Sequence, residues 1–437
     1  MNEPNQEKID STVSQQTVRS IQLFKQLLIE RQINAYRLSK ETGIDRSYLS
    51  KLVNGAIAKP GAEKLDKIAR ALSIEPQQLW KIFTQPAESE LTGIELSRQV
   101  TTSTHQDWGN APNKLICYGR SVETDTLKRW MITESCKVVT LFGLEGIGKT
   151  TLAIKVSQQF EREFDYIFWR SLKNTLLIEE ILADMLKLFG NEQTTESSIS
   201  KQISQLFIYL RTFRCLVVLD GVESTLVTNS SSEQYQQGHL FTEFLHQMAQ
   251  SQHQSCLLLV SNEKSRDMAV LESASGSVRS LKLEGLDSAA RNILQDKQLL
   301  QEEKWDELIK AYCGYPLALK IVATTIQEVF GGNVSEFLAQ NTLFLGDLEF
   351  ILHQEYQRLS SLEKKLMCTI ALVTETKSVS ISQLNRELGD GVRRSEIIRS
   401  LDTFKRRSLV EVERVDDESL YGLHPVIKKY LLSQCKF

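Results

Sequence analysis

Continuous apolar runs recur through the middle of the chain, with helical spacing between them. The runs cover residues 138–142, 164–172, 215–219 and 256–260. Buried strands of a parallel sheet have this appearance, because crossover helices cover both faces of the sheet. A short edge strand over 279–286 completes the set. The pattern predicts an α/β domain with a parallel sheet over residues 107–285.

The segments on either side of this domain show helical spacing instead. A polar tail over 1–17 precedes helices in 18–83, and Ser, Thr and Gln accumulate in a linker over 84–106. Amphipathic helices fill 286–356. In 357–437, three helices are followed by two short strands, which is the order of a winged helix. We therefore expect a multidomain protein with an all-α N-terminal module, a central α/β domain, a helical domain and a C-terminal winged helix.

Composition narrows the class of protein. The 437 residues are 24% charged and 41% hydrophobic, and they include no apolar run of about 18 residues that could cross a membrane. The polar N-terminus argues against a signal peptide. Seven cysteines without a C-x-x-C pair indicate reduced thiols. We expect a cytoplasmic protein without a membrane partner.

Charge is distributed unevenly although the net charge is only −3. Residues 18–83 hold about 12 Lys and Arg against about 6 Asp and Glu, so this module is basic. Its two middle helices meet at Gly43 and Ile44, with Asp45 placed to cap the second. Core and turn residues stand at Leu38, Gly43, Ile44, Leu49, Leu52, Gly55, Leu65, Ile68, Ala69 and Leu72. This set resembles the five-helix Cro/C1-type helix-turn-helix.

That resemblance implies how the module would contact double-stranded DNA. The second helix of the pair would read base edges in the major groove through Arg46, Ser47, Tyr48 and Lys51. Phosphate contacts would come from Arg37, Lys40 and Lys59. Ala35 stands where the family often has Gln, so one backbone anchor is missing. The alternative is a small protein-interaction domain whose charges are merely solvated.

The sequence GLEGIGKTT, from Gly143 to Thr151, stands between an apolar strand and a helix. Its G-x-x-x-x-G-K-T spacing is that of a phosphate-binding loop, in which backbone N–H groups, the lysine and the helix N-terminus converge on an anion. The expected phosphate-binding residues are Gly143, Gly146, Gly148, Lys149, Thr150 and Thr151. The hydroxyl of Thr150 is also an expected Mg²⁺ ligand. A glycine-rich turn that binds nothing is the alternative.

The run over 215–219 ends in Asp220. An acid at the end of a buried strand beside a phosphate loop holds Mg²⁺, so Asp220 is the expected Walker B residue, with an ordinary helix-capping Asp as the alternative. Many hydrolases place a second acid next, but Gly221 follows here and Glu223 is the candidate substitute. Efficient hydrolysis is not expected. Residues 224–238 are interpreted as a surface loop without chemistry.

Further features occur in a fixed order around these motifs. Tyr118, Gly119 and Arg120 precede the phosphate loop, and Asn262 follows the apolar run over 256–260. The sequence GYPLALK then covers 314–320, and LHPVIKKYL contains His424. Together with the loop and Asp220, this order over 107–437 resembles the NB-ARC family of STAND-class signalling NTPases, in its prokaryotic form.

The NB-ARC resemblance implies a role for each of these residues. The adenine-side residues would be Tyr118, Gly119, Arg120 and Pro316. Asn262 takes the γ-phosphate sensor position, where the family usually has Arg, so the distinction between ATP and ADP should be weaker. His424 would contact the β-phosphate of ADP from the winged helix, although Leu423 and Pro425 depart from the family triplet. A proline in a first helical turn and a histidine at a strand-to-helix turn also have purely structural explanations.

A nucleotide-dependent switch follows from the resemblance. It would bind ADP or ATP with Mg²⁺, close over ADP, and open and self-associate with ATP, with slow hydrolysis as a timer. The first hypothesis is a transcription regulator that reads DNA through residues 18–83. The alternative is an oligomerising signalling or defence scaffold whose N-terminal helices recruit a protein. An active metabolic or remodelling ATPase is disfavoured by Gly221 and Asn262, and the other five histidines show no metal-binding spacing.

Overall fold

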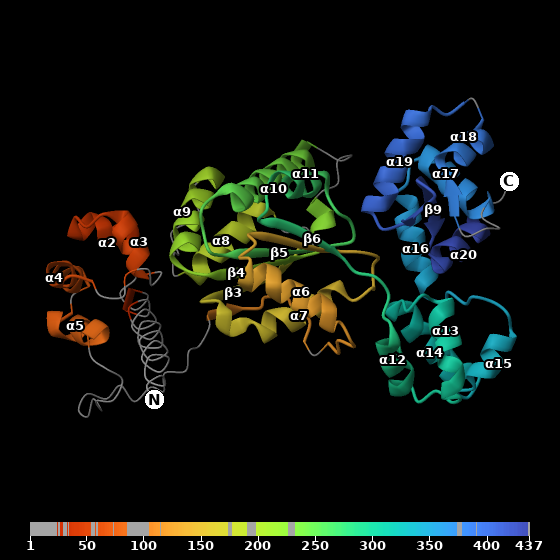
Figure 1. The fold of residues 1–437 in the computed structure, drawn as a ribbon, viewed down its shortest axis with the longest axis horizontal. Helices are drawn as coiled ribbons and strands as arrows, with labels where there is room; N and C mark the ends of the chain where they lie inside the picture. Colours follow the sequence, from red (N-terminus) through yellow and green to blue (C-terminus); the bar gives the residue numbers. More distant parts are fainter. Residues whose placement is uncertain are drawn as a thin grey trace, which may run out of the picture.

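The structure is a computed structural model. It describes residues 24, 27–28, 33, 35–53, 57, 60–72, 74–84, 105–113, 115–173, 177–189, 198–225, 232–373, 378–389 and 391–435. Four parts follow one another along the chain: an N-terminal module, a central α/β domain, a helical part and a C-terminal part (Figure 1).

A parallel sheet of six strands forms the middle of the central domain, in the order β1-β3-β4-β5-β2-β6. The strands are β1 (His105–Asp107), β2 (Val138–Phe142), β3 (Tyr166–Ser171), β4 (Cys215–Asp220), β5 (Cys256–Ser261) and β6 (Val278–Lys282). Every residue of β4 and β5 is buried, as their continuous apolar sequences predict. The predicted α/β domain with a parallel sheet is confirmed.

Helices cover both faces of this sheet. They are α6 (Ser121–Lys128), η1 (Arg129–Thr133), α7 (Lys149–Gln159), η2 (Glu161–Glu163), α8 (Ile178–Leu188), α9 (Ile199–Thr212), η3 (Val222–Thr225), α10 (Ser232–Gln250) and α11 (Arg266–Ala274). Neighbouring strand residues belong to different cores: Trp169 packs with α6 and α7, whereas Phe168 packs with α8, α9 and α10. The alternation follows from the two-residue period of a strand.

Two details of this domain differ from the sequence prediction. Strand β1 begins at His105, inside the predicted linker, and pairs with β3 at the edge of the sheet. Its sequence His-Gln-Asp contains no apolar residue that would predict a strand. An edge strand can form without one, since backbone pairing with a single neighbour holds it in place. Helix α10 begins at Ser232, inside the predicted surface loop. It begins with the polar sequence Ser-Glu-Gln-Tyr-Gln-Gln-Gly, which lacks a helical apolar pattern.

The register of the sheet aligns the ends of three strands. Phe142 of β2 is opposite Ser261 of β5, and Asp220 of β4 is opposite Val260 of β5. Because all three strands are parallel, the segments that leave their carboxyl ends meet along one edge. This places the glycine loop, Asp220 and Asn262 side by side.

The helical part follows the sheet. It contains η4 (Ser288–Ala290), α12 (Arg291–Asp296), η5 (Glu302–Lys304), α13 (Trp305–Ala311), α14 (Pro316–Val329) and α15 (Val334–Ala339). The C-terminal part contains α16 (Leu348–Gln357), α17 (Ser361–Val373), β7 (Ser378–Ser380), α18 (Ile381–Leu388), α19 (Arg394–Arg406), β8 (Val410–Val415), β9 (Glu418–Leu423) and α20 (Pro425–Gln434). One continuous hydrophobic core joins both parts to one face of the central sheet.

The C-terminal part has the predicted three helices, α17, α18 and α19, and two strands, β8 and β9, together with strand β7 and helices α16 and α20. Strand β7 joins β9 and β8 in an antiparallel sheet of order β7-β9-β8. Helix α16 lies against both α20 of this part and α14 of the helical part (Figure 1), so the domain boundary predicted after residue 356 stays a prediction. Whether this part acts as a winged helix stays a prediction.

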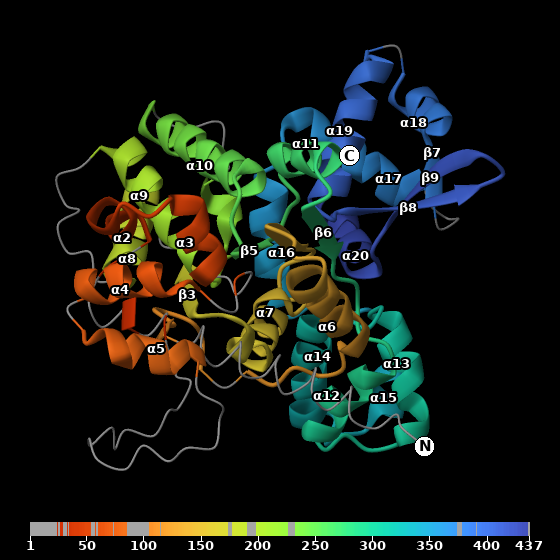
Figure 2. The same cartoon turned by 60° about the vertical axis from the view of Figure 1, so that its left-hand side comes forward.

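The N-terminal module has its own hydrophobic core. Its described helices are α2 (Ala35–Thr42), α3 (Arg46–Val53), α4 (Ala62–Ala71) and α5 (Pro76–Thr84). Most of the helix predicted over 18–31 lies outside the described residues, but Phe24 and Leu28 are helical and buried in this core. Helix α3 lies beside α9 of the central domain (Figure 2).

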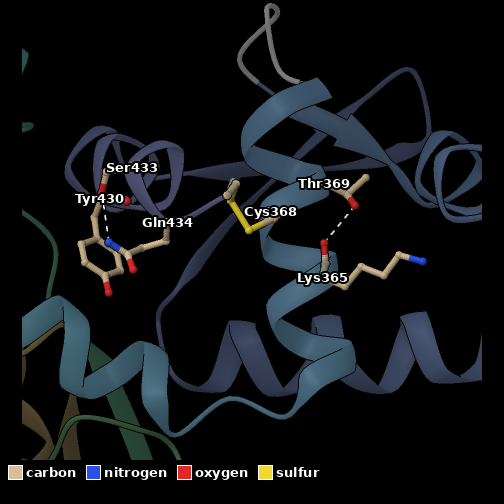
Figure 3. The surroundings of a disulfide bond; sticks show 7 residues. Lys365, Cys368, Thr369, Tyr430, Ser433 and Gln434 are labelled. Carbon is tan, nitrogen blue, oxygen red and sulfur yellow. Dashed lines mark hydrogen bonds between the residues drawn. A yellow bond between two sulfur atoms is a disulfide. The ribbon is translucent and has the colours of Figure 1, made fainter. Parts of the chain in front are cut away.

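A disulfide bond corrects the expectation of reduced cysteines. Cys368 of α17 is bonded to Cys435 at the end of α20, with an S–S distance of 2.07 Å (Figure 3). The two cysteines are 67 residues apart, so no local spacing could reveal the pair. Cysteines 117, 136, 215, 256 and 313 are free thiols. Within the described part of the chain, no helix is both long enough and apolar enough to span a bilayer.

Candidate functional site

The glycine loop after β2 adopts a backbone that favours glycine at three positions. Gly143, Gly146 and Gly148 have φ angles of 152°, 80° and 102°. Side chains rarely adopt such angles, which explains the spacing of the motif. Gly148 is the N-cap of α7, and a β-carbon built on it would meet nothing within 4 Å. The N-terminus of α7 therefore has open space beside its first N–H groups, which suits an anion.

Lys149 points back into this loop. Its Nζ donates hydrogen bonds to the carbonyl oxygens of Gly143 (2.9 Å) and Leu144 (2.8 Å), and to Oδ1 of Asn262 (2.8 Å). Burial lowers the pKa of Lys149 to about 8, although the nearby carboxylates of Glu223 and Glu145 act in the opposite direction. All three partners are neutral, so a negatively charged oxygen would compete well for this ammonium group.

Thr150 and Asp220 face each other at the same edge of the sheet. The hydroxyl of Thr150 lies 3.1 Å from each carboxylate oxygen of Asp220. Burial raises the pKa of Asp220, and the hydrogen bond from Thr150 opposes this effect. Oxygen atoms of hydroxyl and carboxylate groups are the donors that Mg²⁺ prefers. The pair therefore fits the predicted Mg²⁺ site.

Glu223 anchors the segment that carries Asn262. Its Oε2 accepts hydrogen bonds from the backbone N–H of Asn262 (3.1 Å) and from the hydroxyl of Ser261 (3.2 Å). Glu223 thus stands beside the loop, although it lies three positions after Asp220 in the sequence. Its anchoring of Asn262 could not be predicted, because the contact joins two different strand ends.

The residues predicted for the adenine side lie next to the loop and brace it. Arg120 is 7% exposed, and its Nη2 donates to the carbonyl oxygens of Ile147 (2.9 Å) and Glu284 (2.7 Å). The hydroxyl of Tyr118 donates to Asp296, and the carbonyl oxygen of Gly119 accepts from Lys155 at 3.2 Å. The bond of Arg120 to Ile147 reaches the loop itself, whereas Tyr118 and Gly119 are held by α12 and α7. Contact with adenine stays a prediction.

Helix α14 covers the tip of the loop through two residues that flank Pro316. The hydroxyl of Tyr315 donates to the carbonyl oxygen of Glu145. A β-carbon built on Gly146 would lie 2.4 Å from Cδ2 of Leu317, so these two residues are in tight contact. Pro316 itself is buried in the first turn of α14. The GYPLALK motif predicted a site role for Pro316, but it did not predict the loop contacts of Tyr315 and Leu317.

His424 connects the C-terminal part to this cover. It is the N-cap of α20, where its Nδ1 accepts the N–H of Val426 at 3.3 Å. Its ring meets the ring of Tyr315 edge to face. Burial lowers the pKa of His424 to about 4, although Glu284 acts to raise it. The ring is therefore neutral near pH 7, and contact with a β-phosphate stays a prediction.

A cavity of about 470 Å³ lies beside His424. Its walls come from the loop after β6, the end of α13 and strand β8, and they include Glu284, Lys310 and Glu411. His424, the predicted β-phosphate contact, lines it, whereas the residues of the glycine loop do not. The cavity is thus a neighbour of the predicted nucleotide site.

The N-terminal module presents most of the predicted DNA contacts to solvent. Oδ1 of Asp45 accepts the N–H groups of Ser47 (2.8 Å) and Tyr48 (3.3 Å), which confirms the predicted cap of α3. Arg46, Ser47 and Lys51 are exposed. Tyr48 is half-buried, and the Nζ of Lys64 lies 3.5 Å from the centre of its ring.

The predicted phosphate contacts belong to α2 and to the segment after α3. Lys40 is exposed, as is Arg37, which forms an ion pair with Glu41 at 2.8 Å. Lys59 lies outside the described residues. The described basic residues are thus exposed on α2 and α3, and their contact with DNA stays a prediction.

Two sequence families match this chain. The NB-ARC domain matches residues 120–256, and the Cro/C1-type HTH DNA-binding domain matches residues 24–85. An uncharacterized WD repeat-containing protein of Nostoc sp. is 38% identical over 363 residues, which cover 79% of this chain and 28% of that protein. The disease resistance protein RPM1 of Arabidopsis thaliana is 32% identical over 97 residues, which cover 20% of this chain and 10% of that protein. The chain therefore spans less than a third of the length of these relatives.

Among solved structures, the ORC2 protein of Aeropyrum pernix in its ADPNP-ADP complexes is similar to this chain. The two share 17% sequence identity, with a TM-score of 0.44, over 75% of this chain and 97% of ORC2.

Proposed function

Because the chain combines an NB-ARC domain with an N-terminal Cro/C1-type helix-turn-helix domain, we propose that it is a nucleotide-dependent switch that controls DNA binding. One observation carries this proposal. The glycine loop is contacted by Tyr315 and Leu317 of the helical part. The ring of Tyr315 in turn contacts His424 of the C-terminal part. Whatever binds the loop therefore acts on contacts that hold three parts of the chain together.

The ligand that we propose is ADP or ATP with Mg²⁺. The phosphates would lie against the loop and the N-terminus of α7, and Thr150 and Asp220 would hold the metal ion. Bound Mg²⁺ would neutralise part of the phosphate charge. Lys149 would donate to phosphate oxygens in place of its two loop carbonyl partners, Gly143 and Leu144, because charge-assisted hydrogen bonds are the stronger ones.

The switch would depend on the third phosphate. In the form described here, Asn262 holds Lys149 at 2.8 Å. A γ-phosphate would compete with Asn262 for that ammonium group, whereas ADP would leave the Asn262 bond and the contacts of His424 in place. We therefore propose that ADP favours the closed form, and that ATP favours an open form that self-associates. The C-terminal part, with β8 and β9 as its wing, would move as a winged helix.

The output would be regulated transcription. Arg46, Ser47, Tyr48 and Lys51 would read base edges, and Arg37, Lys40 and Lys59 would contact phosphates. The position of α3 beside α9 supports a link between the nucleotide state and access to DNA, since α3 carries the reading residues. A scaffold that recruits a protein through the same helices is the alternative outcome of the tests.

Calorimetric titration with ADP and ATP in the presence of Mg²⁺ tests the proposed ligand. We expect binding by the wild-type chain and loss of most of it in Lys149→Ala. Lys137→Ala is the matched control, because Lys137 stands at the opposite end of β2. Equal binding by both variants, or none by the wild-type chain, would contradict the assignment. Failure of the ATP-loaded chain to retard any duplex at low salt would favour the scaffold.

A further inference from the structure

The segment that follows β5 places two neighbouring side chains against two different parts of the protein. Asn262 accepts its hydrogen bond from Lys149 in the glycine loop. The carboxylate of Glu263 lies instead against two arginines of the C-terminal part, with Oε2 3.5 Å from Nη2 of Arg358 and 3.7 Å from Nε of Arg407. One peptide unit thus separates the predicted nucleotide sensor from a contact between domains.

Glu263 belongs to a cluster of four charges. Glu355, near the end of α16, pairs with Nη1 of Arg358 at 3.0 Å and with Nη2 of Arg407 at 2.7 Å. The side chain of Arg407 is only 9% exposed, and its Nε is buried without a hydrogen bond in the described structure. Two carboxylates and two guanidinium groups balance in charge. We call these four residues the inter-domain charge cluster.

The charges in this cluster depend on one another. Burial acts to raise the pKa of Glu355, but Arg358 and Arg407 hold it below its usual range. When one member of a buried ion cluster is removed, the remaining charges lose their compensation. Glu263 is the member that the central domain contributes, so its withdrawal would leave the two arginines with the single carboxylate of Glu355.

The backbone on both sides of Glu263 is also fixed. On one side, the N–H of Asn262 donates to Glu223 at 3.1 Å. On the other side, the N–H of Lys264 donates to the carbonyl oxygen of Arg406, at the end of α19, at 2.9 Å. A displacement of Asn262 therefore cannot be absorbed within this segment without a change in the contact with α19.

We propose that Glu263 is a positioning residue that transmits the state of Asn262 to the C-terminal part through Arg358 and Arg407. The inference rests on the proposed nucleotide switch and adds a route for it. While Lys149 holds Asn262, Glu263 stays between the two arginines and the closed form is favoured. When a γ-phosphate takes Lys149, the segment after β5 is released and the cluster loses its fourth member. An interaction that exists in one conformer only shifts the equilibrium toward that conformer.

The test uses the full chain and four variants. Glu263→Gln removes the charge with little change in shape, Arg407→Gln removes a partner, and the double variant combines both. Arg406→Gln is the matched control, since the side chain of Arg406 pairs with Asp402 of its own helix at 3.1 Å and leaves its backbone carbonyl in place. Small-angle X-ray scattering measures the radius of gyration with ADP and with a non-hydrolysable ATP analogue, and a fluorescent ADP measures affinity.

We expect Glu263→Gln to bind ADP and yet to populate the expanded form with ADP at least about fivefold more than the wild-type chain. Arg406→Gln should behave as the wild-type chain. In the Arg407→Gln background, Glu263→Gln should add little, because the two residues act through one contact. If Glu263→Gln does not fold, Arg358→Gln carries the same test at a side chain that is 35% exposed.

The outcomes separate the two proposals. If the wild-type chain expands with the ATP analogue and Glu263→Gln responds identically with both nucleotides, the route through Glu263 is wrong and the switch stands. If Glu263→Gln loses thermal stability equally with both nucleotides but keeps the wild-type dimensions, the cluster is only structural. If the wild-type chain binds neither nucleotide, the proposed function fails and this inference fails with it.

Discussion

The ring of His424 meets the ring of Tyr315 edge to face, with 5.7 Å between the ring centres. The hydroxyl of Tyr315 donates to the carbonyl oxygen of Glu145 in the glycine loop. Helix α20 is thus linked to the predicted phosphate site through one aromatic pair and one hydrogen bond. Loss of the His424 ring removes a contact that we assign to the proposed closed form.

His424→Ala should weaken the closed form. An edge-to-face pair contributes about 1 kcal/mol, so the ratio of closed to open form should fall about fivefold. Stopped-flow release of a fluorescent ADP should become faster by a similar factor. His424→Asn is the control, because Asn also caps a helix but lacks the ring. Wild-type release rates in His424→Ala would refute the role of the contact. Wild-type rates in His424→Asn alone would assign the effect to the cap of α20.

The low pKa of His424 predicts a loss of stability in acid. The pKa is about 4 in the folded chain, against an ordinary value of 6.5, because burial disfavours the charged ring. The unfolded chain therefore binds more protons between these values, and the free energy of unfolding falls as the pH drops through this window. Relative to His424→Asn, the wild-type chain should lose about 2 kcal/mol between pH 7 and pH 5. If urea denaturation shows the same change in the free energy of unfolding for both proteins between pH 7 and pH 5, the prediction is wrong.

Gly146→Ala should destabilise the chain through two separable effects. The new β-carbon would lie 2.4 Å from Cδ2 of Leu317, and the φ angle of 80° disfavours any side chain. We expect a cost of about 2 kcal/mol in the free energy of unfolding, of which about 1 kcal/mol is backbone strain. Adding Leu317→Ala should relieve only the steric share. Thermal unfolding of the two single variants and the double variant checks this, and additive losses would rule out the predicted contact.

Substitutions of a base-reading residue and of a phosphate-contacting residue in the N-terminal module should affect DNA binding differently. Arg46→Ala should cost about 1–3 kcal/mol at a cognate duplex and leave weak non-specific binding nearly intact. Lys40→Ala should weaken binding to all sequences alike and flatten the salt dependence by about one charge. The measurement is the affinity of the ATP-loaded chain at several salt concentrations, for a duplex selected from a random pool and for a scrambled one. Equal loss on both duplexes in Arg46→Ala would exclude base reading by this residue.

Local patterns in the sequence predicted the parts of the site that lie within single motifs. The glycine loop needs φ angles that only its spacing of glycines allows, and the apolar runs before Asp220 and Asn262 identify buried parallel strands. The cap by Asp45 was likewise predictable, because a cap depends on neighbouring residues. Strand β1 and the start of α10 could not be predicted, since both have polar sequences without an apolar pattern; β1 is held by its pairing with β3.

Contacts between distant segments could not be predicted in the same way. The pairing of Glu263 with Arg358 and Arg407 joins residues about 100 or more positions apart, and each is an ordinary surface charge in the sequence. The same holds for the contact of Leu317 with Gly146 and for the disulfide of Cys368 with Cys435. The contacts of Glu263 and Leu317 arise only when the parts of the chain fold against one another, and the proposed switch depends on them, whereas the disulfide joins two helices within the C-terminal part.

The central claim is that the identity of the bound nucleotide sets the conformation of the whole chain. Small-angle scattering combined with light scattering, on one preparation loaded with Mg²⁺ and either ADP or a non-hydrolysable ATP analogue, tests it most directly. We predict a compact monomer with ADP, and an expanded form of higher mass with the ATP analogue, with the difference abolished in Lys149→Ala. Identical dimensions and identical mass with both nucleotides, in a wild-type chain shown to bind both, would contradict the account.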